Sequence, residues 1–273
     1  MNATNLTIVI PAANESANID RCVRSALTLA DHVVVYCMGT DDTHKKAASL
    51  GAHVVTWAPK LSPFSDVQEA INHAIDACQT SWIMRIDADE EITPTLATEI
   101  TQRLEHSPMN VVAYGVPRAQ FFIKKFLYWG DWGYDRLVRL WQPSKARYEH
   151  TQETHVHEQL TVHGEIGYLT ERLNHYSHPS WAVLNEKFQT YTDLEARSLT
   201  ISSAEAVMKA LFLPPYITAR WIIYHHGYLD GIWGIAAGFV RGWYDWLVYT
   251  KYLKMRSFPD HSTKSSVTYT EIK

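Results

Sequence analysis

Hydrophobic and polar positions alternate in two different rhythms along the first hundred residues. Short apolar runs predict buried strands at residues 6–10, 32–36, 52–57 and 82–86. Apolar residues three and four apart predict helices at residues 14–29, 43–50, 66–78 and 93–104. This alternation predicts an α/β domain with a Rossmann-like, mainly parallel sheet and helices on both faces. Ligands of such sheets bind beyond the carboxyl ends of the strands.

The pattern changes after residue 110. Strands are predicted at residues 111–117 and 136–141, joined by an aromatic loop, and a polar stretch rich in His and Glu follows at residues 150–158. Helical spacing then dominates, with helices predicted at residues 182–201, 204–212, 216–228 and 231–255. We therefore predict a catalytic domain over residues 1–178 and a helical, amphipathic extension over residues 179–273.

Composition narrows the classes of protein. The chain has 273 residues, 46% of them apolar and 20% charged, which is typical of a globular protein. Its net charge of −4 argues against a nucleic-acid partner, because binding to a phosphate backbone requires concentrated Lys and Arg. Three scattered cysteines favour neither a disulfide framework nor a zinc site, so a cytoplasmic location is expected.

An acidic cluster follows the predicted strand at residues 82–86. Asp87 and Asp89 flank Ala88, and their i, i+2 spacing would place both carboxylates on one side of an extended chain. Mg²⁺ or Mn²⁺ typically binds one or two carboxylates plus substrate phosphates. Asp87 would then face a nucleotide ribose and Asp89 a metal ion. The alternative is a solvated turn that caps the next helix, but the position after a strand of an α/β series favours the metal site.

Several motifs in order resemble the family 2 glycosyltransferases with the GT-A fold, and more narrowly the bacterial lipopolysaccharide-core glucosyltransferases. The motifs are TIVIPAANES at residues 7–16, GTDDT at 39–43, DADEE at 87–91, GYDR at 133–136, VHE at 156–158, LNHYS at 173–177 and GYLDG at 227–231. The resemblance runs from about residue 7 to residue 255. No single motif is specific to this family, but the occurrence of several of them in this order is.

The resemblance implies a donor site for a nucleotide-diphosphate sugar, with a UDP-sugar as the first expectation. The implied donor-binding residues are Pro11, Ala12, Glu15, Asp87, Ala88 and, for the phosphates, Arg139. Two positions depart from the family pattern. Tyr36 stands where relatives carry an acid, so either Tyr36 contacts the base or Asp41 serves instead. Ile71 stands where relatives carry an arginine, so one cationic phosphate contact is missing.

Inverting transfer needs a general base that deprotonates the acceptor hydroxyl. Glu158 of the VHE motif is the first candidate and Asp135 the second. His157 is expected to contact the metal or the diphosphate, while His163 and His175 are predicted to be structural. Arg136 and Arg139 are three apart on a strand and should face opposite ways.

Aromatic residues crowd the last helices. The longest uncharged run, residues 231–240, is about half of the ~20 residues that a transmembrane helix needs. Trp and Tyr mixed with aliphatic and basic residues are typical of the membrane interface, so these helices predict peripheral contact with the inner face of the cytoplasmic membrane. The alternative is packing on the catalytic domain or on a second copy in a homo-oligomer.

These features favour a metal-assisted, inverting hexosyltransferase that acts on a lipid-linked or lipopolysaccharide-type glycan. One rival is a non-catalytic, membrane-associated protein with a degenerate nucleotide site, which Tyr36 and Ile71 support. Another is a nucleotidyltransferase, but the PAANES segment at residues 11–16 lacks the Gly-rich loop that holds a triphosphate.

Overall fold

The computed structural model describes residues 5–58, 63–149 and 160–257, with the backbone alone for 63–65. These residues form two compact units. The first extends to Phe121 and resumes from Trp132 to Ser177, and the second combines Phe122–Asp131 with the chain from His178 onward. The predicted boundary after residue 178 lies one residue from the observed one, but a short segment of the aromatic loop belongs with the helices.

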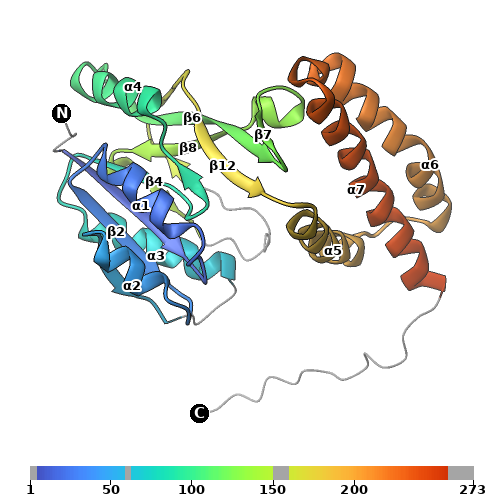
Figure 1. Cartoon of the computed structure of the whole chain (residues 1–273), viewed down its shortest axis with the longest axis horizontal. Coiled ribbons are helices and arrows are strands. Elements are labelled where there is room, and N and C mark those ends of the chain that lie inside the picture. The colour runs from blue at the N-terminus through green and yellow to red at the C-terminus, as the bar shows by residue number, and fades with distance from the viewer. Residues whose placement is uncertain (1–4, 59–62, 150–159, 258–273) are drawn as a thin grey trace, which may run out of the picture. The chain divides into compact units, whose positions relative to one another are not determined.

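The first unit is built on one large sheet (Figure 1). Its parallel part has the order β3 (His53–Thr56), β2 (His32–Cys37), β1 (Leu6–Ala12) and β4 (Trp82–Arg85). The sheet continues through β8 (Arg136–Trp141), which is antiparallel to β4, and then through β6 (Val111–Phe122), β12 (Leu173–His178) and the short β5 (Glu90–Glu91). Strand β11 (Glu165–Tyr168) also pairs with β6, and β9 (Ala146–Tyr148) pairs separately with β10 (Leu160–Val162).

Helices cover both faces of the parallel part, as predicted. One face carries α1 (Ile19–Leu27), α2 (Thr43–Ser49) and α4 (Pro94–Glu105), and the other carries α3 (Pro63–Ala77). Helix α1 begins five residues later than predicted because the residues before it form a loop at the carboxyl end of β1. Its side chains Ile19, Val23 and Ala26 are completely buried, and each large apolar side chain contributes about 1.5–3 kcal/mol on full burial. The α/β class is confirmed.

The second unit is helical and contains α5 (Trp181–Ser198), α6 (Ser203–Ala219), a π-helical turn (Arg220–Tyr224), a 3₁₀ turn (Gly227–Asp230) and α7 (Ile232–Ser257), with strand β7 (Lys125–Leu127). The carboxylate of Asp230 accepts hydrogen bonds from the backbone N–H groups of Tyr128 and Trp129, both at 2.9 Å. These bonds attach the short loop segment to the helices. Among the described residues, no helix combines the length and apolar character needed to cross a bilayer.

The predicted separate helices at residues 204–212 and 216–228 are wrong. Helix α6 continues through Pro214 and Pro215 to Ala219. Proline in a helix interior removes a hydrogen bond and normally breaks the helix. Here α7 packs so closely that a Cβ on Gly242 would lie 2.8 Å from the carbonyl oxygen of Pro214. Tertiary packing against α7 therefore outweighs the local preference.

Candidate active site

The acidic cluster forms a closed turn after β4. The Glu90 N–H donates to the carbonyl oxygen of Asp87 at 2.9 Å, and the Glu90 carboxylate accepts from the Asp87 N–H at 2.8 Å. Ala88 is buried inside this turn. The expected extended chain is therefore wrong at this point. Backbone reversal, and not strand alternation, decides where the carboxylates of Asp87 and Asp89 point.

Asp87 is held by two arginines. Arg85 Nε donates to Asp87 Oδ1 at 3.1 Å, and Arg139 Nη2 donates to Oδ2 at 2.5 Å. Burial alone would raise the pKa of Asp87, but the charges of Arg139 and Arg85 hold the pKa of that carboxyl well below its usual value. Asp87 is thus ionised at neutral pH and fixed in one orientation.

A buried ionic network continues below Asp87. Glu90 is fully buried and accepts from Arg139 at 3.0 Å and from Arg118 at 3.2 Å. Burial disfavours the charged form of Arg139 and would lower its pKa. The negative charges of Asp87 and Glu90 outweigh this effect and raise the pKa of the guanidinium. Arg139 is only 3% exposed, and its positive charge is paired with these two carboxylates. A contact of Arg139 with the donor phosphates stays a prediction. Arg136 lies exposed over the Tyr168 ring, whereas Arg139 is buried.

Asp89 faces a different partner, His175 of β12. Asp89 Oδ2 lies 3.3 Å from His175 Nε2, and both side chains are partly exposed. The pairing of β12 with β5 sets this approach, since His175 is in register with Glu90 and the Tyr176 N–H donates to the carbonyl oxygen of Asp89 at 2.9 Å. Sequence analysis predicted a structural role for His175, because no spacing motif connects residues so far apart in the chain.

The Asp89 and His175 atoms fit a shared divalent cation. Octahedral Mg²⁺ has ligands at about 2.0–2.1 Å, which places neighbouring ligand atoms roughly 3 Å apart. The observed 3.3 Å matches that spacing. The described part of the chain contains no group of three or more His, Cys, Asp or Glu side chains that could hold a metal. Mg²⁺ is usually bound by one or two carboxylates plus substrate phosphates and water, and Asp89 is the carboxylate of this pair.

Of the two candidate bases, Asp135 lies among the described residues and Glu158 does not; the candidate metal ligand His157 is also outside them. Asp135 follows the 3₁₀ turn Asp131–Tyr134, and its Oδ2 accepts from Arg118 Nε at 2.9 Å, from Arg118 Nη2 and from Gln120 Nε2 at 3.3 Å. The carboxylate of Asp135 is therefore an anchor for Arg118, which in turn contacts Glu90.

The loops after β1 and β2 are locked together. Asn14, at φ 58°, uses its side-chain oxygen to accept from the N–H groups of Thr40 and Asp41, at 3.0 and 3.3 Å. The Asp41 carboxylate accepts from the N–H groups of Thr43, at 3.0 Å, and Ser16, at 3.1 Å. Hydrogen bonds, chiefly from the Thr43 hydroxyl, lower the pKa of Asp41 to about 2. Asp41 thus braces the two loops.

The remaining predicted donor residues line the same end of the sheet. Pro11 and Ala12 are buried at the end of β1. The Glu15 N–H donates to Thr43 Oγ1 at 2.9 Å, and its carboxylate accepts from Asn18 Nδ2 at 2.8 Å. The structure therefore brings Glu15 and Asp41 together through Thr43. Their contacts with a nucleotide stay a prediction.

Both departures from the family pattern are core residues. Tyr36 is 2% exposed, its hydroxyl lies 2.8 Å from His73 Nδ1, and its ring meets Trp57 edge-on at 5.7 Å. Burial raises the pKa of the Tyr36 hydroxyl. Ile71, on α3, is fully buried in the same cluster. Stacking of Tyr36 on a base would require its ring to leave this position.

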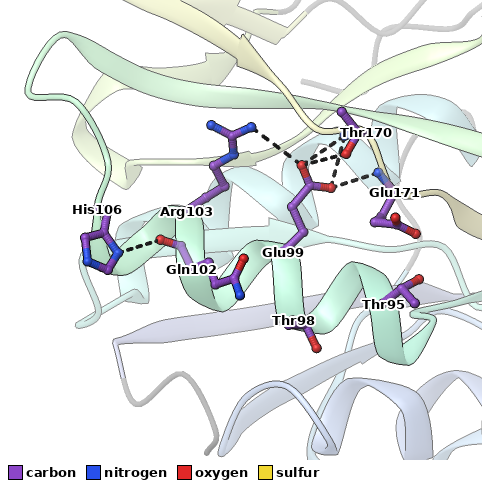
Figure 2. Close-up of a pocket in the computed structure, with 8 residues that line it drawn as sticks. All are labelled: Thr95, Thr98, Glu99, Gln102, Arg103, His106, Thr170 and Glu171. Carbon is purple, nitrogen blue, oxygen red and sulfur yellow. Dashed lines mark hydrogen bonds and ion pairs between the residues drawn. The ribbon is translucent and has the colours of Figure 1, made fainter.

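A polar hollow of about 820 Å³ lies elsewhere, on α4 (Figure 2). The Glu99 carboxylate there accepts from the N–H groups of Thr170 and Glu171, at 3.0 and 2.8 Å, and Arg103 lies 3.7 Å away. Figure 2 shows these bonds joining the helix to the turn before β12. Since Glu99 is occupied in this way, the hollow is a structural joint and not the reaction centre.

The structure places the paired aspartates Asp87 and Asp89 directly after β4, a parallel strand inside the sheet. The family model of glycosyl transferase family 2 matches residues 7–171, more than half of the chain. The chain belongs to that family and is a glycosyltransferase.

Relatives of similar length extend the match. An uncharacterised glycosyltransferase of Rickettsia prowazekii is 26% identical over 258 residues, which is 86% of this chain and 85% of that protein. The lipopolysaccharide core biosynthesis glycosyltransferase LpsC of Rhizobium meliloti is 26% identical over 251 residues, 86% of each chain. Glucosyl-3-phosphoglycerate synthase of Mycobacterium tuberculosis, solved with Mn²⁺ and uridine diphosphate, is 22% identical at a TM-score of 0.33 over 44% of each chain. That last likeness is too partial to bear on the site.

Proposed function

We propose that this glycosyltransferase moves a hexose, with inversion, from a nucleotide-diphosphate sugar to a hydroxyl of a lipopolysaccharide-type glycan, and that Mg²⁺ or Mn²⁺ assists. The observation that carries the proposal is the 3.3 Å approach of Asp89 to His175 beside an Asp87 fixed by two arginines. A UDP-sugar is the first donor to test. Asp89 and His175 are the proposed metal ligands, and Asp87 the proposed contact for the ribose.

The proposed roles of the residues follow from their charges. The cation would stabilise the diphosphate as it leaves. Asp89 and His175 hold and orient that charge, and the arginines beneath Asp87 keep its carboxylate ionised and in place. Since Arg85 and Arg139 already neutralise Asp87 and Glu90, Asp89 supplies the negative charge that attracts the cation.

Glu158 remains the proposed general base. The Asp135 carboxylate is engaged by Arg118 and Gln120, which favours a positioning role for it. A base must be able to take a proton from the acceptor hydroxyl during in-line attack on the anomeric carbon. Glu158 comes seventeen residues after the end of β8 and fifteen before β12, in the stretch between the two strands that flank the site.

The acceptor proposal is supported by the function named for LpsC, lipopolysaccharide core biosynthesis. Such acceptors are anchored in lipid, so we place the protein at the inner face of the cytoplasmic membrane. The degenerate-site alternative is disfavoured because the two departures, Tyr36 and Ile71, are buried packing residues and leave Asp87, Asp89 and His175 undisturbed.

Donor turnover tests this proposal. Purified protein is incubated with a panel of nucleotide-diphosphate sugars with and without Mn²⁺, and release of nucleoside diphosphate is followed. Turnover of at least one donor should need the metal, and Asp89→Ala should lower it at least about a hundredfold, because metal stabilisation is worth several kcal/mol. The matched control Asp76→Ala removes an exposed carboxylate that pairs with Arg147 and should leave turnover unchanged. Metal-independent turnover, or an active Asp89→Ala, would contradict the proposal.

A further inference from the structure

Helices α6 and α7 expose large apolar side chains that a water-soluble surface normally buries. Eight of them, each 37–72% exposed, define what we call the aromatic face: Met208, Leu211, Phe212 and Tyr216 on α6, with Ile232, Phe239, Trp243 and Trp246 on α7. Exposed apolar residues that occur singly need no explanation, but a contiguous set marks an interaction site.

Part of each set lies on the same side of the helix pair. The helices are antiparallel, since Thr218 Oγ1 donates to the Gly238 carbonyl and Lys209 lies over the Tyr249 ring. Four of the eight residues come one position, about 100° of rotation, after a residue buried in the unit. On α6, Leu211 follows Ala210 in this way.

The same offset recurs along α7, where Phe239, Trp243 and Trp246 follow Gly238, Gly242 and Asp245. Gly238 and Gly242 are the positions at which α7 packs closely against α6 and the turn after it. When two antiparallel helices are in contact, a side chain rotated by about 100° from the contact line of each helix, in its own N-to-C direction, points to the same side of the pair. Leu211 of α6 and Phe239, Trp243 and Trp246 of α7 therefore lie on one side of the helix pair.

Charge in this unit fits a negatively charged surface. Residues 210–219 and 231–240, which contain five of the eight residues of the aromatic face, carry no charged side chain. The described residues of the helical unit nevertheless contain ten Lys and Arg against seven Asp and Glu, although the whole chain has a net charge of −4. Two copies meeting through this unit would bring like charges together, which disfavours self-association.

We propose that the aromatic face docks on a lipid bilayer that contains anionic lipids. Trp and Tyr rings settle at headgroup depth, and aliphatic and Phe side chains reach the acyl boundary, about 5–10 Å deep. Basic residues of the unit add attraction to anionic headgroups. The inference deepens the proposed function, on which it rests for the location of the acceptor, but it concerns a surface separate from the reaction centre.

The test is co-sedimentation of the full-length protein with vesicles of phosphatidylcholine, with and without phosphatidylglycerol. Wild-type protein should bind the anionic vesicles more tightly, and added salt should weaken binding. Leu211→Glu and Phe239→Glu, at positions 62% and 63% exposed, should each reduce the affinity about tenfold or more. The control Met109→Glu changes a fully exposed residue of the other unit and should bind like wild type.

Two outcomes would overturn the inference. One is equal binding of all variants, or binding without preference for anionic vesicles. The other is a wild-type dimer in light scattering that Leu211→Glu and Phe239→Glu convert to monomers, since a second copy would then cover the face. Turnover of a soluble donor should be the same in all four proteins. Vesicle binding without donor turnover would therefore count against the proposed function alone.

Discussion

At the scale of the residue, the paired aspartates have different environments and so different tasks. Asp87 accepts hydrogen bonds from Arg85 and Arg139, whereas Asp89 lies close to His175. Removing ions from water is costly, and a buried pair repays that cost only with good geometry and full hydrogen bonding. The network of Arg139 with Asp87 and Glu90 meets this condition, so we regard Arg139 as the residue that positions the acidic turn.

Replacement of Arg139 by Gln tests this role. The change leaves the fully buried Glu90 short of a counter-charge, and breaking a buried pair in this way typically lowers the free energy of unfolding by about 3–5 kcal/mol. Urea denaturation measures the loss. The matched variant Arg136→Gln, on the exposed side of the same strand, should change stability by less than about 1 kcal/mol. Equal effects of the two substitutions would show that the buried network does not stabilise the fold.

Sequence alone found the residues whose signal is local. Asp87 and Asp89 stand out because they directly follow a buried apolar run, and strand order places that run in the sheet. His175 lies in the LNHYS motif but was predicted to be structural, since its approach to Asp89 depends on the pairing of β12 with β5. The partners of Arg139 were also hidden, because the turn that aims Asp87 and Glu90 at it is set by bonds between backbone and side chain.

At the scale of the element, the strands and helices of the first unit agree with the hydrophobic period of their sequences. Helix α6, in contrast, continues through two prolines that would normally end it. Pro214 and Pro215 predicted a break, but close packing of Gly242 overrides it. The loops at the carboxyl edge show a similar dependence on close approach. A Cβ on Gly39 would lie 2.4 Å from the backbone nitrogen of Asn14, so only glycine lets the two loops meet.

Gly39→Ala should therefore separate the loops after β1 and β2. We expect the affinity for a nucleoside diphosphate to fall about tenfold or more, because both loops are proposed to contact the nucleotide and a displacement of about 1 Å is enough to lose such contacts. Fluorescence or calorimetric titration measures the change. Gly51→Ala is the control: its φ of +96° makes alanine strained, but it lies at the far end of α2. An unchanged affinity of Gly39→Ala for the nucleoside diphosphate would show that nucleotide binding does not depend on the close contact between these two loops.

At the scale of the whole molecule, the chain divides its chemistry between two units. The α/β unit contains the acidic turn and most of the negative charge, and the helical unit contains the aromatic face and an excess of basic residues. A transferase with a lipid-anchored acceptor would benefit from this division, because one unit can bind a soluble donor while the other stays at the membrane surface. The donor site remains the central claim, since both proposals concern an enzyme that uses it.

Calorimetric titration of uridine diphosphate, with and without Mn²⁺, tests that claim most directly. The proposed ligands predict tight binding that depends on Mn²⁺ in the wild type and loss of that dependence in both Asp89→Asn and His175→Gln. His163→Gln, an exposed histidine outside the site, should bind like the wild type. If uridine diphosphate binds equally well without metal, or if His175→Gln keeps full dependence on Mn²⁺, the metal centre at Asp89 and His175 is contradicted.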